Sequence, residues 1–454
     1  MSSPPQASSS PPTIYEIVLE ENQELRFEVE AGKQVIVELI KGTAEIFGAE
    51  LPLNRRYTFG PGSRVGLFTW HGATVEFVGD KNCQYIAKAT PMMIYVNTHA
   101  ALEQLRQQVE SELMGERSAG GDGGTMGPRL MITGPTDVGK STYCKLLLNY
   151  AVRQGRRPTY VDLDVGQGSI SVPGTLSALE IIRAADPIDG FDKTSPLVFQ
   201  FGHLSPGENV PLFNLKVGQL ASAVTARCRS SPEANVGGVV VNTCGWVKGA
   251  GYHCLVKAAE AFEVDVVVVL DHERLYNDLQ RDLPKFVKIV HQPKSGGVED
   301  RSRQVRISAR NERIKQYFYG NRRQYSPHLL EGVRFDDVQI YQIGTSAVPD
   351  SLLPAGTDTG VDHHTTVVPV VPSAQLKNKL LGISLAPLDQ QPAAVVGGGP
   401  SQPAKAPSVI DGSVAGFVAV VDVDLETSTM KLLSPQAQLC ARALICSDVT
   451  FYDD

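Results

Sequence analysis

Residues 130–142 read Leu-Met-Ile-Thr-Gly-Pro-Thr-Asp-Val-Gly-Lys-Ser-Thr, and this stretch decides the fold of the central part of the chain. It fits the pattern G-x-x-x-x-G-K-[ST] without mismatch, from Gly134 to Ser141. An apolar run, Leu130–Thr133, precedes the glycine turn, and a run with helical spacing, Thr142–Gln154, follows it. Strand, loop and helix in this order predict a phosphate-binding loop, whose backbone N–H groups hold phosphate oxygens at the positive end of the helix.

Within such a loop each residue type has a chemical task. Lys140 reaches the β- and γ-phosphates, and the Ser141 hydroxyl completes a Mg²⁺ shell. GTPases read guanine with N-K-x-D after a strand, but here residues 242–246 contain neither Lys nor Asp. We therefore expect ATP and Mg²⁺ as the cofactors. The predicted nucleotide-binding residues of the loop are Asp137, Val138, Gly139, Lys140, Ser141 and Thr142.

The sequence around the loop, residues 129–320, alternates between predicted strands and helices. Residues 239–241 and 266–269 are continuously apolar, which is typical of parallel strands with both faces covered. This pattern predicts an α/β domain with a parallel sheet and the nucleotide at the carboxyl ends of the strands. The predicted strands are Leu130–Thr133, Thr159–Asp164, Leu197–Phe201, Val236–Asn242 and Val264–Leu270. The predicted helices are Thr142–Gln154, Leu212–Cys228, Tyr252–Phe262 and Glu273–Leu283.

The regions on either side of residues 129–320 have different sequence patterns. Residues 13–114 contain closely spaced alternating segments separated by Gly, Asn and Pro, followed by the helix Thr98–Met114, which predicts an all-β sandwich with a bridging helix. Residues 115–128 read as a flexible linker, and residues 1–12 are too polar to fold alone. Residues 321–454 predict a small β or α/β domain interrupted by a disordered insert at about 349–411.

Composition narrows the class of protein. A chain of 454 residues implies two or three domains. Its net charge of −7 argues against a protein whose surface is covered in Lys and Arg for non-specific nucleic-acid binding. The seven cysteines form no C-x-x-C pair, so neither a zinc site nor a disulfide framework is indicated. No apolar run approaches the roughly 20 residues of a membrane span, and we expect an intracellular protein without membrane partners.

Carboxylates at strand ends are the candidates for catalysis. Asp164 lies at the tip of the predicted strand Thr159–Asp164, directly before a glycine turn. A phosphate-loop enzyme needs an acid at this place, to order Mg²⁺ or to accept a proton. Asp162 lies on the same face but deeper, and we interpret it as structural. Asp271 also ends an apolar strand and is a weaker candidate.

Two further features suit a nucleic-acid substrate. Trp246 follows a strand in a Gly-flanked loop, where a flat ring can stack on a base, although a packing role is the alternative. Residues 301–323 hold eight basic residues and one acid. Arg306 and Arg310 are four apart, so on a helix they share a face and could clamp a phosphoryl group as a lid, or simply belong to a solvated basic helix.

Four segments taken together, 134–142, 162–168, 242–249 and 306–320, resemble one family. It is the polynucleotide 5′-hydroxyl kinase family that includes the Clp-type subunit of the pre-mRNA cleavage and polyadenylation machinery. The likeness extends to residues 25–30, 68–72 and 97–104, and so covers nearly the whole chain. The Ser/Pro-rich N-terminus and the long C-terminal insert are similar to those of fungal members.

The resemblance implies roles for individual residues. Lys140, Ser141 and Thr142 would hold ATP phosphates and Mg²⁺, and Asp164 would act as the base for the 5′-hydroxyl of RNA. Catalytic roles would fall to Lys140, Asp164, Arg306 and Arg310, and metal ligation to Ser141 and Asp164. Trp246 and Arg301 would bind RNA, and Glu24 and Arg64 of the β-sandwich would contact the adenine end.

The resemblance also implies a setting and leaves two functions open. The partners would be the scaffold subunit of cleavage factor IA, which binds the RNA polymerase II tail, other 3′-end processing factors and pre-mRNA, all in the nucleus. Kinase-active animal members carry consecutive small hydroxyl residues after Phe201-Gly202, whereas this chain has His203-Leu204-Ser205. An assembly subunit with ATP as a structural cofactor and an active RNA 5′-hydroxyl kinase are therefore both open, with an unrelated ATPase as a distant third.

Overall fold

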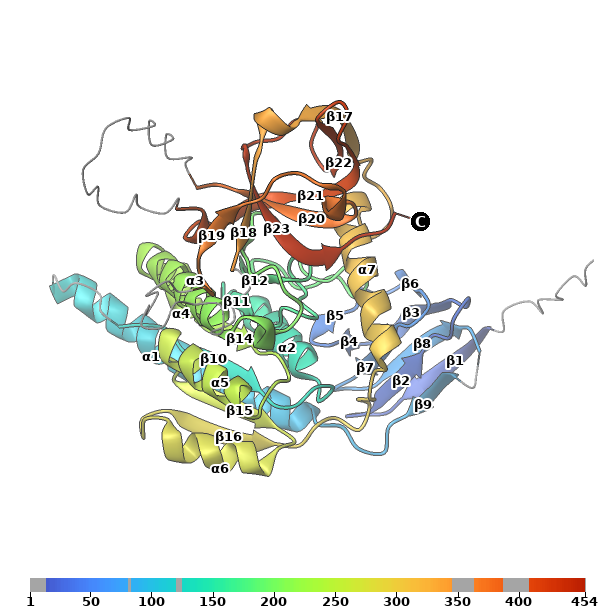
Figure 1. The fold of residues 1–454 in the computed structure, drawn as a ribbon. Helices are drawn as coiled ribbons and strands as arrows, with labels where there is room; N and C mark the ends of the chain where they lie inside the picture. Colours follow the sequence, from blue (N-terminus) through green and yellow to red (C-terminus); the bar gives the residue numbers. More distant parts are fainter. Residues whose placement is uncertain (1–13, 81–82, 120–124, 345–362, 387–407, 454) are drawn as a thin grey trace, which may run out of the picture.

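The computed structural model describes residues 14–80, 83–119, 125–344, 363–386 and 408–453, and Figure 1 shows their arrangement. The described residues form an N-terminal β-sandwich, a central α/β domain and a C-terminal β-sheet domain, as the sequence predicts. The expected disordered segment 1–12 lies outside the described residues.

Two antiparallel sheets face each other in the N-terminal domain, in the orders β1-β8-β3-β6 and β5-β4-β7-β2-β9. Their strands alternate between buried and exposed side chains, as in β3, where Val35, Val37 and Leu39 point into the core. The strands are β1 Ile14–Leu19, β2 Glu24–Glu28, β3 Val35–Gly42, β4 Glu45–Ile46, β5 Ala49–Glu50, β6 Arg56–Phe59, β7 Arg64–Phe68, β8 Ala73–Val78 and β9 Gln84–Ile86.

Helix α1 (Met92–Ala119) leaves the sandwich and packs on the central domain against α2 (Lys140–Arg153) and α4 (Pro232–Gly237). Arg106 of α1 is buried and donates from Nε to the Gly237 carbonyl at 3.0 Å. The helix predicted over Thr98–Met114 is shorter than α1 at both ends. The linker expected at 115–128 is wrong over its first five residues, which continue α1.

The central sheet has the strand order β13-β12-β11-β14-β10-β15-β16. All its strands run in one direction except β12, which is antiparallel to both neighbours. The five predicted strands are present, whereas β12 and β16 were not predicted. The strands are β10 Arg129–Thr133, β11 Thr159–Asp162, β12 Thr175–Glu180, β13 Leu197–Gln200, β14 Val239–Asn242, β15 Val266–Leu270 and β16 Lys288–Gln292.

Helices cover both faces of this sheet. Residues of α1 and α2 share one buried cluster with β10 and β11, and residues of α3 (Val210–Ser230) and α5 (Ala250–Ala261) share another on the opposite face. Helix α6 (Glu273–Asp282) packs beside β15 and β16. Helix α7 (Arg303–Tyr319) runs from beside the β-sandwich up to the C-terminal domain (Figure 1). Among the helices of the described part of the chain, none combines the length and apolar character needed to cross a bilayer.

The C-terminal domain is a seven-stranded sheet of order β17-β22-β21-β20-β23-β18-β19. The insert expected at 349–411 is wrong over residues 363–386, because these include β19 and β20, and β20 lies between β21 and β23 with Leu381 fully buried. Residues 345–362 and 387–407 lie outside the described residues. The strands are β17 His328–Arg334, β18 Gln339–Ile343, β19 Val367–Pro369, β20 Lys379–Ser384, β21 Val414–Asp424, β22 Thr429–Ser434 and β23 Ala443–Thr450.

Candidate nucleotide-binding site

The phosphate loop joins β10 to α2, and two of its glycines have backbone conformations that other residues seldom adopt. Gly134 has a φ of +149° and Gly139 a φ of +88°. A Cβ atom on Gly134 would lie 2.6 Å from the Leu270 carbonyl oxygen. Gly139 is the N-cap of α2 and supplies no side-chain cap, so the first N–H groups of the helix keep their hydrogen-bonding capacity for a ligand.

The Lys140 side chain folds back onto the carbonyl groups at the start of the phosphate loop. Its ammonium donates to the Gly134 carbonyl at 3.0 Å and to the Pro135 carbonyl at 2.6 Å. Burial lowers the pKa of Lys140, and the nearby Asp164 carboxylate opposes that shift. A phosphate oxygen entering the loop would meet this buried cation and the free N–H groups together, which is the donor set that a nucleotide triphosphate requires.

Polar atoms next to the loop test whether Mg²⁺ and ATP fit. Asn242 Nδ2 donates to Ser141 Oγ at 3.2 Å and to Asp162 Oδ1 at 3.0 Å, while Asn242 Oδ1 is buried without a partner. Thr133 Oγ1, at the end of β10, is also buried and unpaired. Buried orphan oxygens are costly and need a partner such as a metal-bound water, so the donor set fits a hydrated Mg²⁺ and a phosphate chain.

Strand β11 ends at Asp162, so the predicted strand Thr159–Asp164 is two residues too long, and Asp164 lies two residues beyond the strand end. Its Oδ1 accepts the N–H groups of Gly166 and Gln167, each at 3.0 Å. Burial and then the charge of Asp162 raise the pKa of Asp164, against the opposing effect of these N–H groups and of Lys140. A partly buried carboxylate with a raised pKa beside the phosphate loop is suited to proton transfer.

Asp162 is held in place by hydrogen bonds within the protein. It is buried and accepts hydrogen bonds on both oxygens, including two from Ser169 at 2.8 Å. Further donors are the Asp164 N–H, the Asn242 amide and the Tyr160 hydroxyl. Asp271, the weaker candidate, is exposed and lies 3.5 Å from Lys294. Its carboxylate has no contact with the phosphate loop among the contacts of the described residues.

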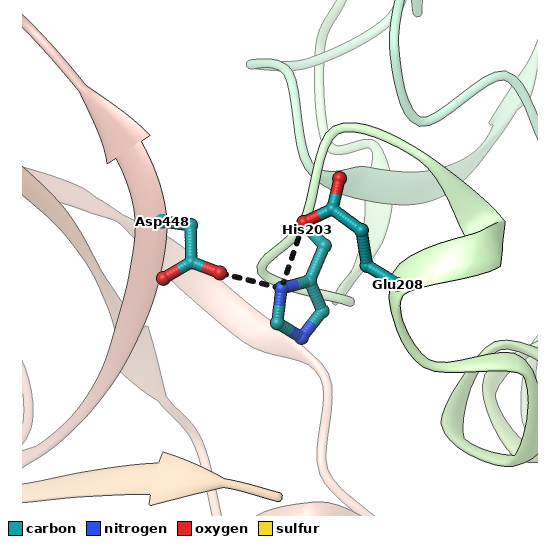
Figure 2. A group of neighbouring side chains, drawn as sticks. All are labelled: His203, Glu208 and Asp448. Carbon is teal, nitrogen blue, oxygen red and sulfur yellow. Dashed lines mark hydrogen bonds and ion pairs between the residues drawn. The ribbon is translucent and has the colours of Figure 1, made fainter. Parts of the chain in front are cut away.

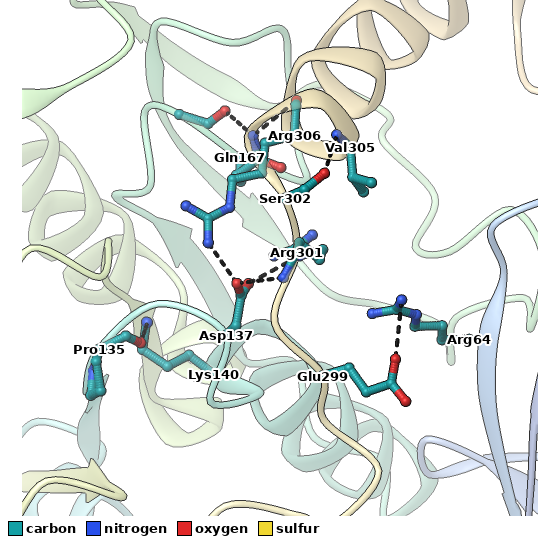
Figure 3. Close-up of polar contacts among 11 residues, drawn as sticks. Arg64, Pro135, Asp137, Lys140, Gln167, Glu299, Arg301, Ser302, Val305 and Arg306 are labelled. Carbon is teal, nitrogen blue, oxygen red and sulfur yellow. Dashed lines mark hydrogen bonds and ion pairs between the residues drawn. The ribbon is translucent and has the colours of Figure 1, made fainter.

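Arg301, which lies just before α7, and Arg306, in the first turn of α7, contact the phosphate loop through one carboxylate (Figure 3). Asp137 Oδ2 accepts from the Arg301 N–H at 2.9 Å and from Arg306 Nη2 at 2.5 Å, while Oδ1 accepts from Arg301 Nε at 3.0 Å. Burial raises the pKa of Asp137, but these hydrogen bonds outweigh it and the pKa lies below its ordinary value. Gln167 also donates to the Arg306 carbonyl at 3.3 Å, which ties the Asp164 turn to α7.

Arg306 and Arg310 lie on one helix, α7, and the first turn of α7 contacts the phosphate loop, while the role of this helix as a lid stays a prediction. Arg310 lies one turn further along α7 and makes no ion pair with a described residue. Arg301 contacts Asp137, so the structure brings it to the phosphate loop, and its RNA-binding role stays a prediction. The sequence could not reveal that Asp137 is the common partner of both arginines, because a loop aspartate carries no such signal.

The β-sandwich reaches the same region through three charged side chains. Arg64 of β7 pairs with Glu28 at 2.9 Å and with Glu299, before α7, at 3.3 Å (Figure 3). Glu24 of β2 does not meet Arg64 but forms a two-pronged pair with Arg26, at 2.9 and 3.1 Å. The sequence analysis missed Arg26.

Of these three charged side chains, Arg26 is the most closely packed. It is 8% exposed and donates to Ser295 Oγ at 3.2 Å. A Cβ on Gly297 would lie 2.9 Å from Arg26 Nε, so the segment before α7 lies directly on the guanidinium. The one signal in the sequence was an arginine between the two core residues Leu25 and Phe27 of a predicted strand, which is insufficient to assign a domain contact.

Trp246 lies in the loop after β14, beside the turn that carries Leu204. A Cβ on Gly207 would lie 3.3 Å from its indole ring, and a Cβ on Gly251 would lie 2.6 Å from it, so glycines allow both approaches. A Cβ on Gly166 would lie 2.9 Å from the Leu204 carbonyl oxygen. The structure thus gathers Trp246, the Leu204 turn and the Asp164 turn at the carboxyl end of the sheet. The Trp246 ring is only partly buried.

The Leu204 turn is fastened to the C-terminal domain by His203 (Figure 2). His203 Nδ1 donates to Asp448 Oδ2 at 2.6 Å and lies 3.6 Å from Glu208 Oε2. The hydrogen bond from His203 lowers the pKa of Asp448. Within the described ranges this is the one group of three His, Cys, Asp or Glu side chains that could hold a metal ion, and it includes neither Ser141 nor Asp164.

Comparison with known proteins accounts for the three domains in order. Residues 18–109 match a family described as the N-terminal beta-sandwich domain of polyadenylation factor, and residues 134–320 match the P-loop of mRNA cleavage and polyadenylation factor CLP1. Residues 325–453 match pre-mRNA cleavage complex II protein Clp1. The Protein CLP1 homolog of Brugia malayi is 53% identical over 97% of this chain and 96% of its own length.

The chain belongs to the Clp1 family. The human polyribonucleotide 5′-hydroxyl-kinase Clp1 is 49% identical to it over 98% of this chain and 97% of the human protein. A solved Clp1p–Pcf11p complex has a Clp1 chain that superimposes with a TM-score of 0.78, at 21% identity, over 97% of this chain and 99% of the other. A second structure, which concerns the extended interface between Pcf11p and Clp1p and ATP loss in a point mutant, gives a TM-score of 0.79 at the same identity and coverage. These structures establish the Clp1 fold.

Proposed function

We propose that this Clp1-family chain is an ATP-binding subunit of the nuclear pre-mRNA cleavage and polyadenylation machinery, and that ATP acts in it as a structural cofactor. The observation that carries the proposal is the enclosure of the phosphate loop. Asp137 of the loop is held by Arg301 and Arg306, while Arg26 and Arg64 of the β-sandwich contact the segment before α7.

The residues divide the binding task by domain. Lys140 and the loop N–H groups would hold phosphate oxygens, and Ser141 and Asp164 would hold Mg²⁺. Glu24 and Arg64 face the nucleotide from the β-sandwich side. Bound ATP supplies a polyanion that joins these groups, and by mass action it stabilises the closed arrangement of the domains. Arg301 and Arg306 keep water out of the loop by covering it.

The partners follow from the family. A solved relative is a complex of Clp1p with Pcf11p, and the family descriptions name mRNA cleavage and polyadenylation. We infer that this chain docks on the corresponding scaffold subunit, which binds the RNA polymerase II tail, and works with other 3′-end processing factors on pre-mRNA. This setting implies a nuclear location.

Thermal unfolding with and without ATP and Mg²⁺ tests the structural role of ATP. We expect ATP to raise the Tm of the wild-type chain and not that of Lys140→Ala. The Lys140→Ala variant should also lose capture by the scaffold subunit and fail to restore pre-mRNA cleavage in a depleted extract. Exposed Lys257→Ala is the control. If Lys140→Ala binds no ATP yet docks and restores cleavage, the structural role is wrong.

Active kinase chemistry is the second candidate, favoured by one observation: a carboxylate with a raised pKa, Asp164, lies beside the phosphate loop. In this reaction the RNA 5′-oxygen attacks the γ-phosphorus, its proton passes to Asp164, and the bond from phosphorus to the β–γ bridging oxygen breaks to release ADP. Lys140, Arg306 and Arg310 would stabilise the transferring phosphoryl group, and Trp246 and Arg301 would hold the RNA end.

Transfer of labelled γ-phosphate to a 5′-hydroxyl oligoribonucleotide decides between the two candidates. Because Leu204 has no hydroxyl with which to grip the RNA end, we expect little label with the wild type and more with Leu204→Thr. Label that depends on Asp164 in the wild type would instead establish the kinase, whereas absence of label in both proteins eliminates it.

A further inference from the structure

Strand β14 ends in a buried amide side chain, Asn242, that contacts the first helical turn after the phosphate loop. Asn242 and Asp162 are Cα partners where β14 pairs with β11. The amide nitrogen Nδ2 of Asn242 donates to Asp162 Oδ1 at 3.0 Å and to Ser141 Oγ at 3.2 Å. The residue is 1% exposed. Asn242 therefore joins the carboxyl end of the sheet to the start of α2.

The orientation of the Asn242 amide follows from the chemistry of Asp162. Asp162 accepts the Asp164 N–H on Oδ1 at 3.2 Å and the Ser169 N–H on Oδ2 at 2.8 Å, so both its oxygens act as acceptors. The NH₂ group of Asn242, and not its carbonyl oxygen, must face such a carboxylate. Asn242 Oδ1 is then buried without a hydrogen-bond partner among the described residues. An unpaired buried acceptor is costly, so this oxygen is suited to a donor that a bound ligand brings.

The hydrogen bond from Asn242 also decides how the Ser141 hydroxyl can act. Because Asn242 Nδ2 is the donor, it occupies one lone pair of Ser141 Oγ and leaves the second lone pair and the O–H free. An oxygen lone pair is what Mg²⁺ takes from a phosphate-loop serine, and the O–H can donate to a phosphate oxygen. Asn242 thus turns the Ser141 hydroxyl into the state that a metal–phosphate ligand needs.

The second predicted metal ligand is tied to the same carboxylate oxygen. Asp162 Oδ1 accepts from the backbone N–H of Asp164 as well as from Asn242. Ser141 and Asp164 come from different elements, yet each is at most two hydrogen bonds away from this oxygen. Asn242 is the link on the Ser141 side, so its removal would release Ser141 and leave the contact of Asp164 in place.

We propose that Asn242 is a positioning residue for the metal-bound nucleotide. Its amide nitrogen orients the Ser141 hydroxyl, and its Oδ1 accepts a hydrogen bond from a water of hydrated Mg²⁺. This inference rests on the proposed binding of ATP and Mg²⁺, and it adds a residue outside the phosphate loop. Groups that orient metal ligands in this way typically change metal affinity by about 10–100-fold when they are removed.

The test compares ATP binding by the full chain in Mg²⁺ and in EDTA, measured by calorimetry. Asn242→Ala should weaken ATP binding about tenfold in Mg²⁺ and by less than about twofold in EDTA. The matched control is Ser169→Ala, which removes a hydroxyl hydrogen bond from the other oxygen of Asp162, and it should bind ATP like the wild type in both media. Equal losses in the two media for Asn242→Ala, or no loss in Mg²⁺, overturn the proposal.

A double-mutant cycle shows whether Asn242 acts through Ser141. The double variant of Ser141→Ala and Asn242→Ala should bind ATP in Mg²⁺ only slightly more weakly than Ser141→Ala alone, because the second change removes a group that has lost its target. Losses that multiply in the double variant show two independent contributions and overturn the positioning role.

Asn242→Ser keeps the proposal testable if Asn242→Ala does not fold. A serine hydroxyl has one hydrogen, so it can donate to Asp162 or to Ser141 but not to both, and it brings no carbonyl oxygen. It should therefore fold and show the same Mg²⁺-specific loss, whereas wild-type affinity in Mg²⁺ overturns the inference. Wild-type ATP binding that is equal in Mg²⁺ and EDTA overturns this inference alone. No ATP binding in either medium overturns the proposed function as well.

Discussion

At the scale of single residues, Asp137 has an unusual combination of properties. It has a φ of +56°, which non-glycine residues seldom adopt, and its side chain is almost fully buried beneath Arg301 and Arg306. Backbone strain at such a position persists only where surrounding contacts hold it in place. Asp137 therefore couples the backbone conformation of the phosphate loop to the contact between that loop and α7.

Asp137→Asn should loosen this closure without changing the shape of the side chain. The loss of the charge weakens three hydrogen bonds to partly exposed arginines, so we expect about 1 kcal/mol of destabilisation and faster ATP release. Hydrogen exchange at residues 295–310 should increase. Asp278→Asn, which removes an exposed pair with Arg281, is the control and should change neither quantity. Unchanged exchange in Asp137→Asn would contradict the closure.

Lys193 supplies a prediction about pH. Burial, and then the charge of Arg313, lower its pKa in the folded protein from the ordinary value of 10.5 to about 7, while the charge of Asp162 opposes the shift. The unfolded chain therefore binds more protons between these values, so the free energy of unfolding rises with pH from about 7 to 10. The penalty is complete below pH 7. Lys193→Met should lack this rise, and the difference between the two Tm profiles measures it; parallel profiles would exclude it.

At the scale of elements, the phosphate loop was predictable and β20 was not. Strand β10, the loop and α2 follow from one motif because the glycines and Lys140 have fixed geometric tasks. Strand β20 has an apolar pattern, but it stands among Pro, Ser and Gln-rich pieces that read as an insert. The order β21-β20-β23 depends on long-range pairing, which no local pattern contains. Strand β12 was missed for the same reason.

The burial of β20 can be tested by truncating two leucines of similar sequence context. Leu381 is fully buried and Leu385 is 58% exposed. Leu381→Ala should lower the free energy of unfolding by about 2–5 kcal/mol through lost contacts and a cavity. Leu385→Ala should change it by less than about 0.5 kcal/mol. Urea denaturation measures both, and equal effects would show that β20 is not a core strand.

At the scale of the whole molecule, the proposed nucleotide site draws on residues of separate domains. Motif and spacing in the sequence alone were enough to predict Lys140, Asp164, Arg306 and Arg310 as site residues. Glu24 and Arg64 came only from the family resemblance, and Arg26 was missed altogether. Contacts between domains join residues far apart in the chain, such as Arg26 and Ser295, and no pattern within either segment records the other.

Arg26→Ala tests whether the β-sandwich seals the site. Removing this buried guanidinium leaves Glu24 without its partner and opens the contact with Ser295. We expect ATP binding to weaken about tenfold and protease cleavage between the domains to accelerate, because the lost hydrogen bonds are charge-assisted. Arg56→Ala, which removes an exposed arginine paired within the sandwich, should leave both unchanged. Normal ATP affinity in Arg26→Ala would refute the seal.

Helix α7 is anchored at both of its ends. Its first turn contacts the phosphate loop. Near its other end, the ring of Phe318 stacks on that of Phe451 with 5.5 Å between the ring centroids, and the Tyr317 hydroxyl accepts a hydrogen bond from the Phe417 N–H at 2.8 Å. A helix held at both ends cannot open like a lid that is hinged at one end. Any departure of Arg306 from Asp137 must therefore tilt α7 about its aromatic contacts or move the C-terminal sheet with it, so opening of the proposed nucleotide site is coupled to the position of that sheet.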